Sequence, residues 1–179
     1  MSFKEKSAIV CGAGGGIGLN IATDLLDRDV NVSLVDLKPR PDSLGERIGR
    51  VQYFQGDVTD ETFVKDFIHQ TVFEFGRLDY LVNATGVLWF GHDKSVVEID
   101  IDTWDRVMEI NLKSFALTSR YAVPAICKSG GGALVHIASI DALRGDAQPQ
   151  DAYGASKAGV IRLSKSLAIQ FAKDRIRSN

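Results

Sequence analysis

Short apolar runs alternate with longer amphipathic segments along the whole chain. The runs are near-continuous rather than strictly alternating, which is typical of parallel strands buried on both faces. They predict strands at 7–12, 31–36, 50–58, 79–85 and 132–139. Between them, helical periodicity predicts helices near 16–28, 60–75, 103–128 and 151–173, with a further short helix near 42–48.

This order of strands and helices predicts an α/β fold, in which a doubly wound parallel sheet carries helices on both faces. Such sheets bind ligands beyond the carboxyl ends of the strands, at the point where the strand order reverses. The residues that directly follow each strand are therefore the first candidates for a site. Since the sequence shows no repeat and no linker, we expect residues 1–179 to form a single domain.

Composition mainly excludes functions. A net charge of −2 gives no support for a nucleic-acid surface, and no apolar run approaches the roughly 20 residues that cross a bilayer. Cys11 and Cys127 are too few for a disulfide framework, so we expect a cytoplasmic protein in which both are small core residues. The three histidines, His69, His92 and His136, lack ligand spacing, and we therefore predict no metal site.

A glycine-rich segment, CGAGGGIG (11–18), joins the first predicted strand to the first helix. Glycines let the backbone turn sharply and approach a pyrophosphate, which then lies at the positive N-terminus of the helix. A tight strand–helix turn also needs glycines, but this position, at the first junction of an alternating chain, favours a dinucleotide site. The predicted cofactor loop comprises Gly12, Gly14, Gly15, Gly16, Ile17 and Gly18.

The second predicted strand ends at Asp36. A carboxylate at this position can accept hydrogen bonds from the adenosine ribose and would repel a 2′-phosphate. A turn-initiating Asp is the alternative interpretation. Lys38 and Arg40 could hold a 2′-phosphate, so NADP remains an alternative cofactor. We expect NAD rather than NADP, with Asp36 and Leu37 beside the adenosine.

The third and fourth predicted strands also end in residues suited to this edge. Asp57 can accept from an adenine amino group, and Gly86 permits close backbone approach. Taken singly, each is explained better by ordinary turn chemistry. Taken with the glycine loop, they add five residues to the predicted cofactor site: Asp57, Val58, Asn83, Ala84 and Gly86.

Asn111 interrupts the apolar stripe of the third predicted helix, which otherwise comprises Trp104, Val107, Met108, Phe115 and Ala122. A buried side-chain amide without partners costs about 1–3 kcal/mol. The amide is therefore either satisfied by a local backbone carbonyl or part of a site. The sequence leaves both readings open.

Tyr153 and Lys157 share one face at the start of the last predicted helix, and Ser139 ends the fifth predicted strand. A half-exposed aromatic ring with a lysine stem across it is the ordinary interpretation of such a pair. Against it, all three residues lie at the carboxyl edge that the glycine loop marks. They are therefore candidates for chemistry beside a cofactor.

The ordered set of these motifs resembles the short-chain dehydrogenase/reductase family of Rossmann-fold enzymes, over residues 7–179. Gly12-x-x-x-Gly16-x-Gly18 is similar to the cofactor loop of the family, and Tyr153-x-x-x-Lys157 is similar to its active-site motif. Asn111 and Ser139 match the other two members of its catalytic tetrad. The resemblance implies hydride transfer between NAD(H) and a small-molecule alcohol or ketone.

The resemblance also implies a role for each catalytic residue. Tyr153 would be the general acid/base, helped by the Lys157 ammonium, because a phenol ordinarily titrates near pH 10. Tyr153 and Lys157 would both contact the cofactor, with Lys157 on the nicotinamide ribose. Ser139 would bind the substrate oxygen, and Asn111 would anchor a water in a proton relay. The family pairs subunits through its long helices, which implies a homodimer or homotetramer.

The sequence departs from the family at several points. Cys11 stands where Thr is usual, Ala84 stands where a second Asn is usual, and the spacing from Ser139 to Tyr153 is longer than the commonest one. DRIRSN (174–179) is similar to the approach to the sixth strand of the family. We therefore expect a sheet that lacks the last strand or strands, truncated before the C-terminal substrate-loop region. The alternative functions are a truncated, non-catalytic relative that binds nucleotide or a partner, and an NADP-dependent ketoreductase.

Overall fold

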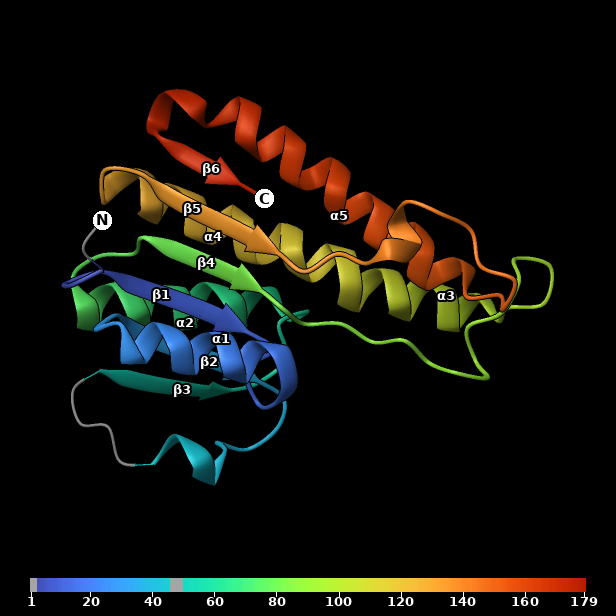
Figure 1. Ribbon diagram of the computed structural model, residues 1–179, viewed down its shortest axis with the longest axis horizontal. Coiled ribbons are helices and arrows are strands. Elements are labelled where there is room, and N and C mark those ends of the chain that lie inside the picture. The colour runs from blue at the N-terminus through green and yellow to red at the C-terminus, as the bar shows by residue number, and fades with distance from the viewer. Residues whose placement is uncertain (1–2, 46–49) are drawn as a thin grey trace.

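The computed structural model describes residues 3–45 and 50–179. These residues form a six-stranded, fully parallel sheet in the order β3-β2-β1-β4-β5-β6 (Figure 1). The strands are β1 (Ser7–Cys11), β2 (Asn31–Asp36), β3 (Val51–Gln55), β4 (Tyr80–Asn83), β5 (Gly132–His136) and β6 (Ile176–Ser178). All five predicted strands are confirmed, and β6 adds three residues of a sixth strand in the segment 174–179.

Helices connect the strands: α1 (Gly16–Asp27), α2 (Glu61–Phe75), α3 (Ile101–Met108), the π-helix η2 (Glu109–Lys113), α4 (Ser114–Lys128) and α5 (Asp151–Gln170). Three 3₁₀ turns also occur: η1 (Asp42–Leu44), η3 (Ile140–Ala142) and η4 (Ala172–Asp174). Of the short helix predicted near 42–48, the structure shows η1, and residues 46–48 lie outside the described residues. No described helix is both long and apolar enough to cross a membrane.

The helices cover both faces of the sheet, as predicted. Successive side chains of a strand point to opposite faces, and β1 shows the division. Ile9 and Cys11 belong to one core cluster, which includes residues of α2 and α4. Ala8 and Val10 belong to a second cluster, which includes residues of α1. All five residues of β1 are buried, which explains the near-continuous apolar run in the sequence.

The long helix predicted at 103–128 consists of α3, η2 and α4 in succession. It begins at Ile101, because the Asp100 carboxylate accepts a hydrogen bond from the Thr103 N–H and caps the helix. The single turn of π-helix places Asn111 in the buried interior. Single π-turns inside α-helices occur frequently at functional sites.

The strand order reverses between β1 and β4. Doubly wound sheets bind ligands outside the carboxyl ends of the strands at such a point. In Figure 1 these ends lie on the same side of the molecule as α3 and the first turn of α5. Residues 12–18, which follow β1, and residues 84–86, which follow β4, therefore meet at this edge.

Candidate active site

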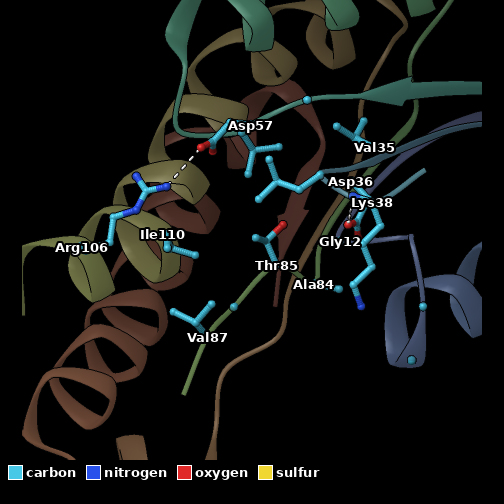
Figure 2. Close-up of a pocket in the computed structure, with 16 residues that line it drawn as sticks. Gly12, Val35, Asp36, Lys38, Asp57, Ala84, Thr85, Val87, Arg106 and Ile110 are labelled. Carbon is cyan, nitrogen blue, oxygen red and sulfur yellow. Dashed lines mark hydrogen bonds and ion pairs between the residues drawn. The ribbon is translucent and has the colours of Figure 1, made fainter. Parts of the chain in front are cut away.

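A cavity of about 400 Å³ lies at this edge (Figure 2). Its lining comes from the end of β2 and from the segments after β1, β2, β3 and β4, together with Arg106 of α3 and Ile110 of η2. The lining includes most of the residues that the sequence assigns to the cofactor: Gly12, Gly15, Gly16, Asp36, Leu37, Asp57, Val58, Ala84 and Gly86. A cavity of this size at a switch point is suited to a small organic ligand.

Close backbone approaches require glycine at both ends of the loop after β1. Gly12 has a φ of +81°, and a Cβ there would lie 2.7 Å from the backbone of Ala84 and Thr85. A Cβ on Gly18 would overlap the carbonyl group of Gly12. The loop therefore folds tightly against the end of β4, and these two glycines serve its shape.

Asp36 braces the tip of the same loop. The Gly14 N–H donates to Asp36 Oδ2 at 2.8 Å, and the Lys38 N–H donates to Oδ1 at 2.9 Å. Gly15 and Gly16, in contrast, have open space where a side chain would begin. They face the cavity where α1 starts, and the backbone N–H groups of a helix N-terminus suit an anionic phosphate.

Asp57 and Arg106 face each other at the other end of the cavity (Figure 2). Arg106 Nη2 lies 3.2 Å from Asp57 Oδ2, and Nη1 lies 2.6 Å from Glu109 Oε2. Partial burial raises the pKa of Asp57, but hydrogen bonds from Thr59 and Arg106 outweigh it, so the pKa lies below its ordinary value. The sequence did not single out Arg106, because it is one of several charged residues on the polar face of an amphipathic helix.

Lys157, on α5, lies beside Gly86, which is one of the residues that line the cavity. Its side chain is 3% exposed, and a Cβ on Gly86 would lie 3.2 Å from Nζ. Nζ donates to the Ile137 carbonyl at 2.8 Å and lies 5.4 Å from the centre of the Phe115 ring. Burial lowers the pKa of Lys157 from 10.5 to about 8.

The structure brings Tyr153 next to Lys157 and places Ser139 on a neighbouring turn. Lys157 Nζ lies 5.8 Å from the centre of the Tyr153 ring. The Ser139 hydroxyl donates to Asp141 Oδ2 at 3.1 Å and accepts from the Asp141 N–H at 3.2 Å, which caps η3. η3 packs against α5 at Gly154, where a Cβ would make an ordinary contact, 3.4 Å from the Asp141 carbonyl oxygen.

Asn111 is fully buried, and three hydrogen bonds satisfy its side-chain amide. Oδ1 accepts from the Val87 N–H at 2.8 Å, while Nδ2 donates to the Val87 carbonyl at 2.9 Å and to Ser156 Oγ at 3.1 Å. The backbone carbonyl that satisfies the amide is not a local one, since Val87 lies 24 residues earlier. Asn111 thus joins the segment after β4 to α5, at the residue before Lys157.

Six predicted cofactor residues are not among those that line the cavity: Gly14, Ile17, Gly18, Asn83, Tyr153 and Lys157. Of these, Ile17 is 61% exposed on α1. Asn83 is fully buried, with Oδ1 accepting from Thr118 Oγ1 at 2.9 Å and Nδ2 lying 3.2 Å from Nδ1 of His136. Because side chains alternate along β4, Asn83 points into the sheet–helix core, and its side chain links β4 to β5 and α4 instead of facing the cavity.

Neither cysteine lies among the cavity residues. Cys11 is buried in the core cluster beside α2 and α4, and Cys127 packs against the same cluster, as predicted. Burial raises the pKa of the Cys11 thiol, which therefore stays protonated. Within residues 3–45 and 50–179, no group of three or more His, Cys, Asp or Glu side chains is placed to hold a metal ion.

Known proteins share this architecture. The family described as enoyl-(acyl carrier protein) reductase matches residues 12–179. One relative, cis-4-hydroxycyclohexanecarboxylate dehydrogenase of Sinomonas cyclohexanicum, is 34% identical over 183 residues, which cover 99% of this chain and 72% of the relative. Another, 7alpha-hydroxysteroid dehydrogenase of Bacteroides fragilis, is 32% identical over 184 residues, which cover 99% and 70%. A solved structure from Burkholderia xenovorans, assigned to the short-chain dehydrogenases/reductases, has a TM-score of 0.90 and 31% identity, with 99% of this chain and 73% of that chain covered. The chain belongs to the short-chain dehydrogenase/reductase family.

This short-chain dehydrogenase/reductase spans about seven tenths of the length of the relatives named above. The family uses nicotinamide dinucleotides, and the cavity fits the adenosine and phosphate parts of such a cofactor. Gly15 and Gly16 leave room at the start of α1, and Asp36 lies at the end of β2. At the Ala84 departure, the backbone of Ala84 packs against Gly12, and Ala84 lines the cavity.

Proposed function

We propose that the protein is an NAD-dependent oxidoreductase that interconverts a secondary alcohol and a ketone, with Tyr153 as general acid/base. One observation carries the proposal. Lys157 Nζ lies against Gly86, at the end of the dinucleotide cavity, and also beside the Tyr153 ring. A single buried cation therefore connects a cofactor site to a phenol. By their names, the two relatives described above act on ring alcohols, which supports a secondary alcohol as the substrate class.

The side chains of this site divide the proton chemistry among them. The bound nicotinamide supplies the hydride acceptor or donor. In alcohol oxidation the Tyr153 phenolate accepts the hydroxyl proton of the substrate, and in ketone reduction the phenol returns it. The Lys157 ammonium favours the phenolate through its charge. Ser139 has one hydroxyl proton, now donated to Asp141, so its hydroxyl must turn from Asp141 to donate to a substrate oxygen.

We infer that Asn111 serves this site by holding Val87 and Ser156 in place. Both N–H groups of its amide are already used, by the Val87 carbonyl and by Ser156. A relay water, as the family resemblance implies, would have to use Asn111 Oδ1 or its main chain. Oδ1 retains one lone pair beyond the hydrogen bond from Val87.

Asp36 supports NAD as the cofactor. Its carboxylate lines the cavity, where a negative charge opposes a 2′-phosphate. Arg40, a candidate partner for such a phosphate, donates instead to the Gly45 carbonyl at 2.6 Å. Lys38 also lines the cavity, and its positive charge could pair with a 2′-phosphate, so NADP is the competing cofactor.

Asp36→Ala is expected to shift the ratio of kcat/KM for NAD to kcat/KM for NADP by about 10- to 100-fold toward NADP. The physical reason is the removal of a like charge opposite the 2′-phosphate, with Lys38 left beside it. The ratio is the useful measure, because loss of the brace on Gly14 weakens both cofactors. Asp42→Ala is the matched control, since Asp42 is an exposed carboxylate in η1 outside the cavity lining. An unchanged ratio in Asp36→Ala would remove the argument for NAD.

The proposed function is tested with purified protein, NAD, NADP and a panel of cyclic and acyclic secondary alcohols, followed by the absorbance of reduced nicotinamide. We expect turnover with NAD, together with a thermal shift that grows with NAD concentration. A thermal shift without turnover of any alcohol, and without any difference between wild type and Tyr153→Phe, would instead support a non-catalytic nucleotide-binding relative.

A further inference from the structure

A buried carboxylate outside the dinucleotide cavity caps the helix that carries Tyr153 and Lys157. Asp93 lies between β4 and α3 and is 4% exposed. Its Oδ1 accepts from the Ala152 N–H at 3.1 Å, and its Oδ2 accepts from the Tyr153 N–H at 2.8 Å. Gln150, at the N-cap position of α5, makes no side-chain cap hydrogen bond. Asp93, which is 60 residues from Tyr153 in the sequence, therefore caps α5 in place of a residue next to the helix.

Neighbouring contacts fasten the same segment to the start of α5. The Asp151 N–H donates to the Lys94 carbonyl at 3.3 Å, and the Val96 N–H donates to Asp151 Oδ2 at 2.8 Å. Ala152 is fully buried in a cluster with Ile99. The connection between β4 and α3 thus holds the first turn of α5 by hydrogen bonds, and the cluster that buries Ala152 also includes Val107 of α3.

We propose that Asp93 is a positioning residue for Tyr153. The N–H groups in the first turn of a helix have no intrahelical acceptors, so this turn depends on outside partners for its position. One of the two N–H groups that Asp93 holds belongs to Tyr153 itself, and Lys157 follows one turn later. The carboxylate charge is also favourable at a helix N-terminus. Asp93 does not contact the cavity; it fixes where the phenol lies relative to it. The inference rests on the proposed function.

A cap with a purely structural role would stabilise the fold without affecting turnover, and the chain contains a matched control for this case. Asp60 caps α2, where its Oδ1 accepts from the Thr62 N–H at 2.8 Å and from the Phe63 N–H at 3.3 Å. None of the proposed catalytic residues lies on α2. Comparing variants at Asp93 and Asp60 therefore separates two effects: the stability lost with a helix cap, and the activity lost when Tyr153 is misplaced.

The kinetic test compares Asp93→Ala, Asp93→Asn and Asp60→Ala with wild type. Asp93→Ala is expected to lower kcat by about 10- to 100-fold, because small misplacements of a reacting group have effects of this size. Asp93→Asn keeps one acceptor oxygen and should recover part of the loss, and KM for NAD should change little. Asp60→Ala should lower the thermal midpoint by a similar amount and leave kcat unchanged. Equal kcat losses at both sites, or an unchanged kcat in Asp93→Ala, would overturn the proposal.

Amide hydrogen exchange gives a readout that does not depend on activity. Exchange over residues 152–157 should be faster in Asp93→Asn than in wild type, and unchanged in Asp60→Asn. Unchanged exchange in Asp93→Asn would overturn the proposed cap. Absence of turnover in wild type would contradict the proposed function. This result is distinct from unchanged exchange in Asp93→Asn, which concerns the cap alone. Should Asp93→Ala fail to fold, Asp93→Asn is used for both the kinetic and the hydrogen-exchange comparison.

Discussion

Tyr153→Phe is expected to lower kcat for alcohol oxidation by about 10²- to 10⁴-fold, the usual contribution of a general acid/base. The substitution keeps the ring, whose centre lies 5.8 Å from Lys157 Nζ, and removes the hydroxyl that exchanges the proton. Because the ring is kept and the residues that line the cavity are unchanged, NADH affinity should change much less than kcat. Steady-state kinetics and NADH fluorescence titration measure the two quantities separately.

Tyr121→Phe is the matched control for this prediction. Tyr121 lies on α4, and its hydroxyl donates to Glu61 Oε1 at 2.6 Å on the exposed surface. Its replacement should leave kcat unchanged. If Tyr153→Phe keeps more than about a tenth of the wild-type kcat, Tyr153 is not the general acid/base.

Lys157→Met is expected to remove most activity and, at the same time, to stabilise the fold. Burial lowers the pKa of Lys157 from 10.5 to about 8, so the folded state bears the cost of a buried ammonium at neutral pH. A difference of about 2.5 pH units corresponds to about 3 kcal/mol. Loss of the hydrogen bond to the Ile137 carbonyl offsets about 1 kcal/mol of this. The free energy of unfolding near pH 7 should therefore rise by about 2 kcal/mol.

The gain from Lys157→Met should depend on pH. Below about pH 8, Lys157 is protonated in both the folded and the unfolded chain, and the cost of the buried charge is complete. Between about pH 8 and 10.5 the unfolded chain binds more protons than the folded chain, so the free energy of unfolding of wild type rises with pH. The advantage of Lys157→Met should shrink across this window, which urea unfolding on either side of it measures.

Lys113→Met provides the control for the stability measurement. The Lys113 side chain is 59% exposed, and Nζ lies 3.3 Å from Glu109 Oε1. Its replacement should change the free energy of unfolding by no more than about 0.5 kcal/mol. If Lys157→Met is less stable than wild type near pH 7, the ammonium is better compensated than its burial implies. A stabilised but inactive Lys157→Met would show that this site is kept for chemistry at the expense of stability.

The sheet and the position of the cavity could be predicted from the sequence because they depend on local patterns and one topological rule. β1 is buried on both faces, so its sequence is a continuous apolar run, and the glycines that follow mark the carboxyl edge. The direction in which an individual side chain points is harder to predict. Asn83 and Ala84 are adjacent at this edge, yet Ala84 lines the cavity and Asn83 is buried in the core.

Contacts between distant segments could not be predicted in the same way. The Asn111 side chain pairs with Val87, and Asp93 pairs with Tyr153, through connections whose path no periodicity describes. The sequence identified Asn111 as an amide in an apolar stripe, but only the structure shows its partners. Nothing in the sequence marks Asp93 as a functional residue, because polar residues are common in long connections.

The π-turn of η2 has a consequence for how the chain would tolerate a deletion. A π-turn takes in about one residue more than the same turn of α-helix, and each residue of an α-helix rotates the chain by about 100°. The faces of α3 and α4 are therefore offset by about one residue in angular phase. A one-residue deletion within Glu109–Lys113 would restore regular helix without unfolding either half, but it would carry Asn111 away from Val87 and Ser156.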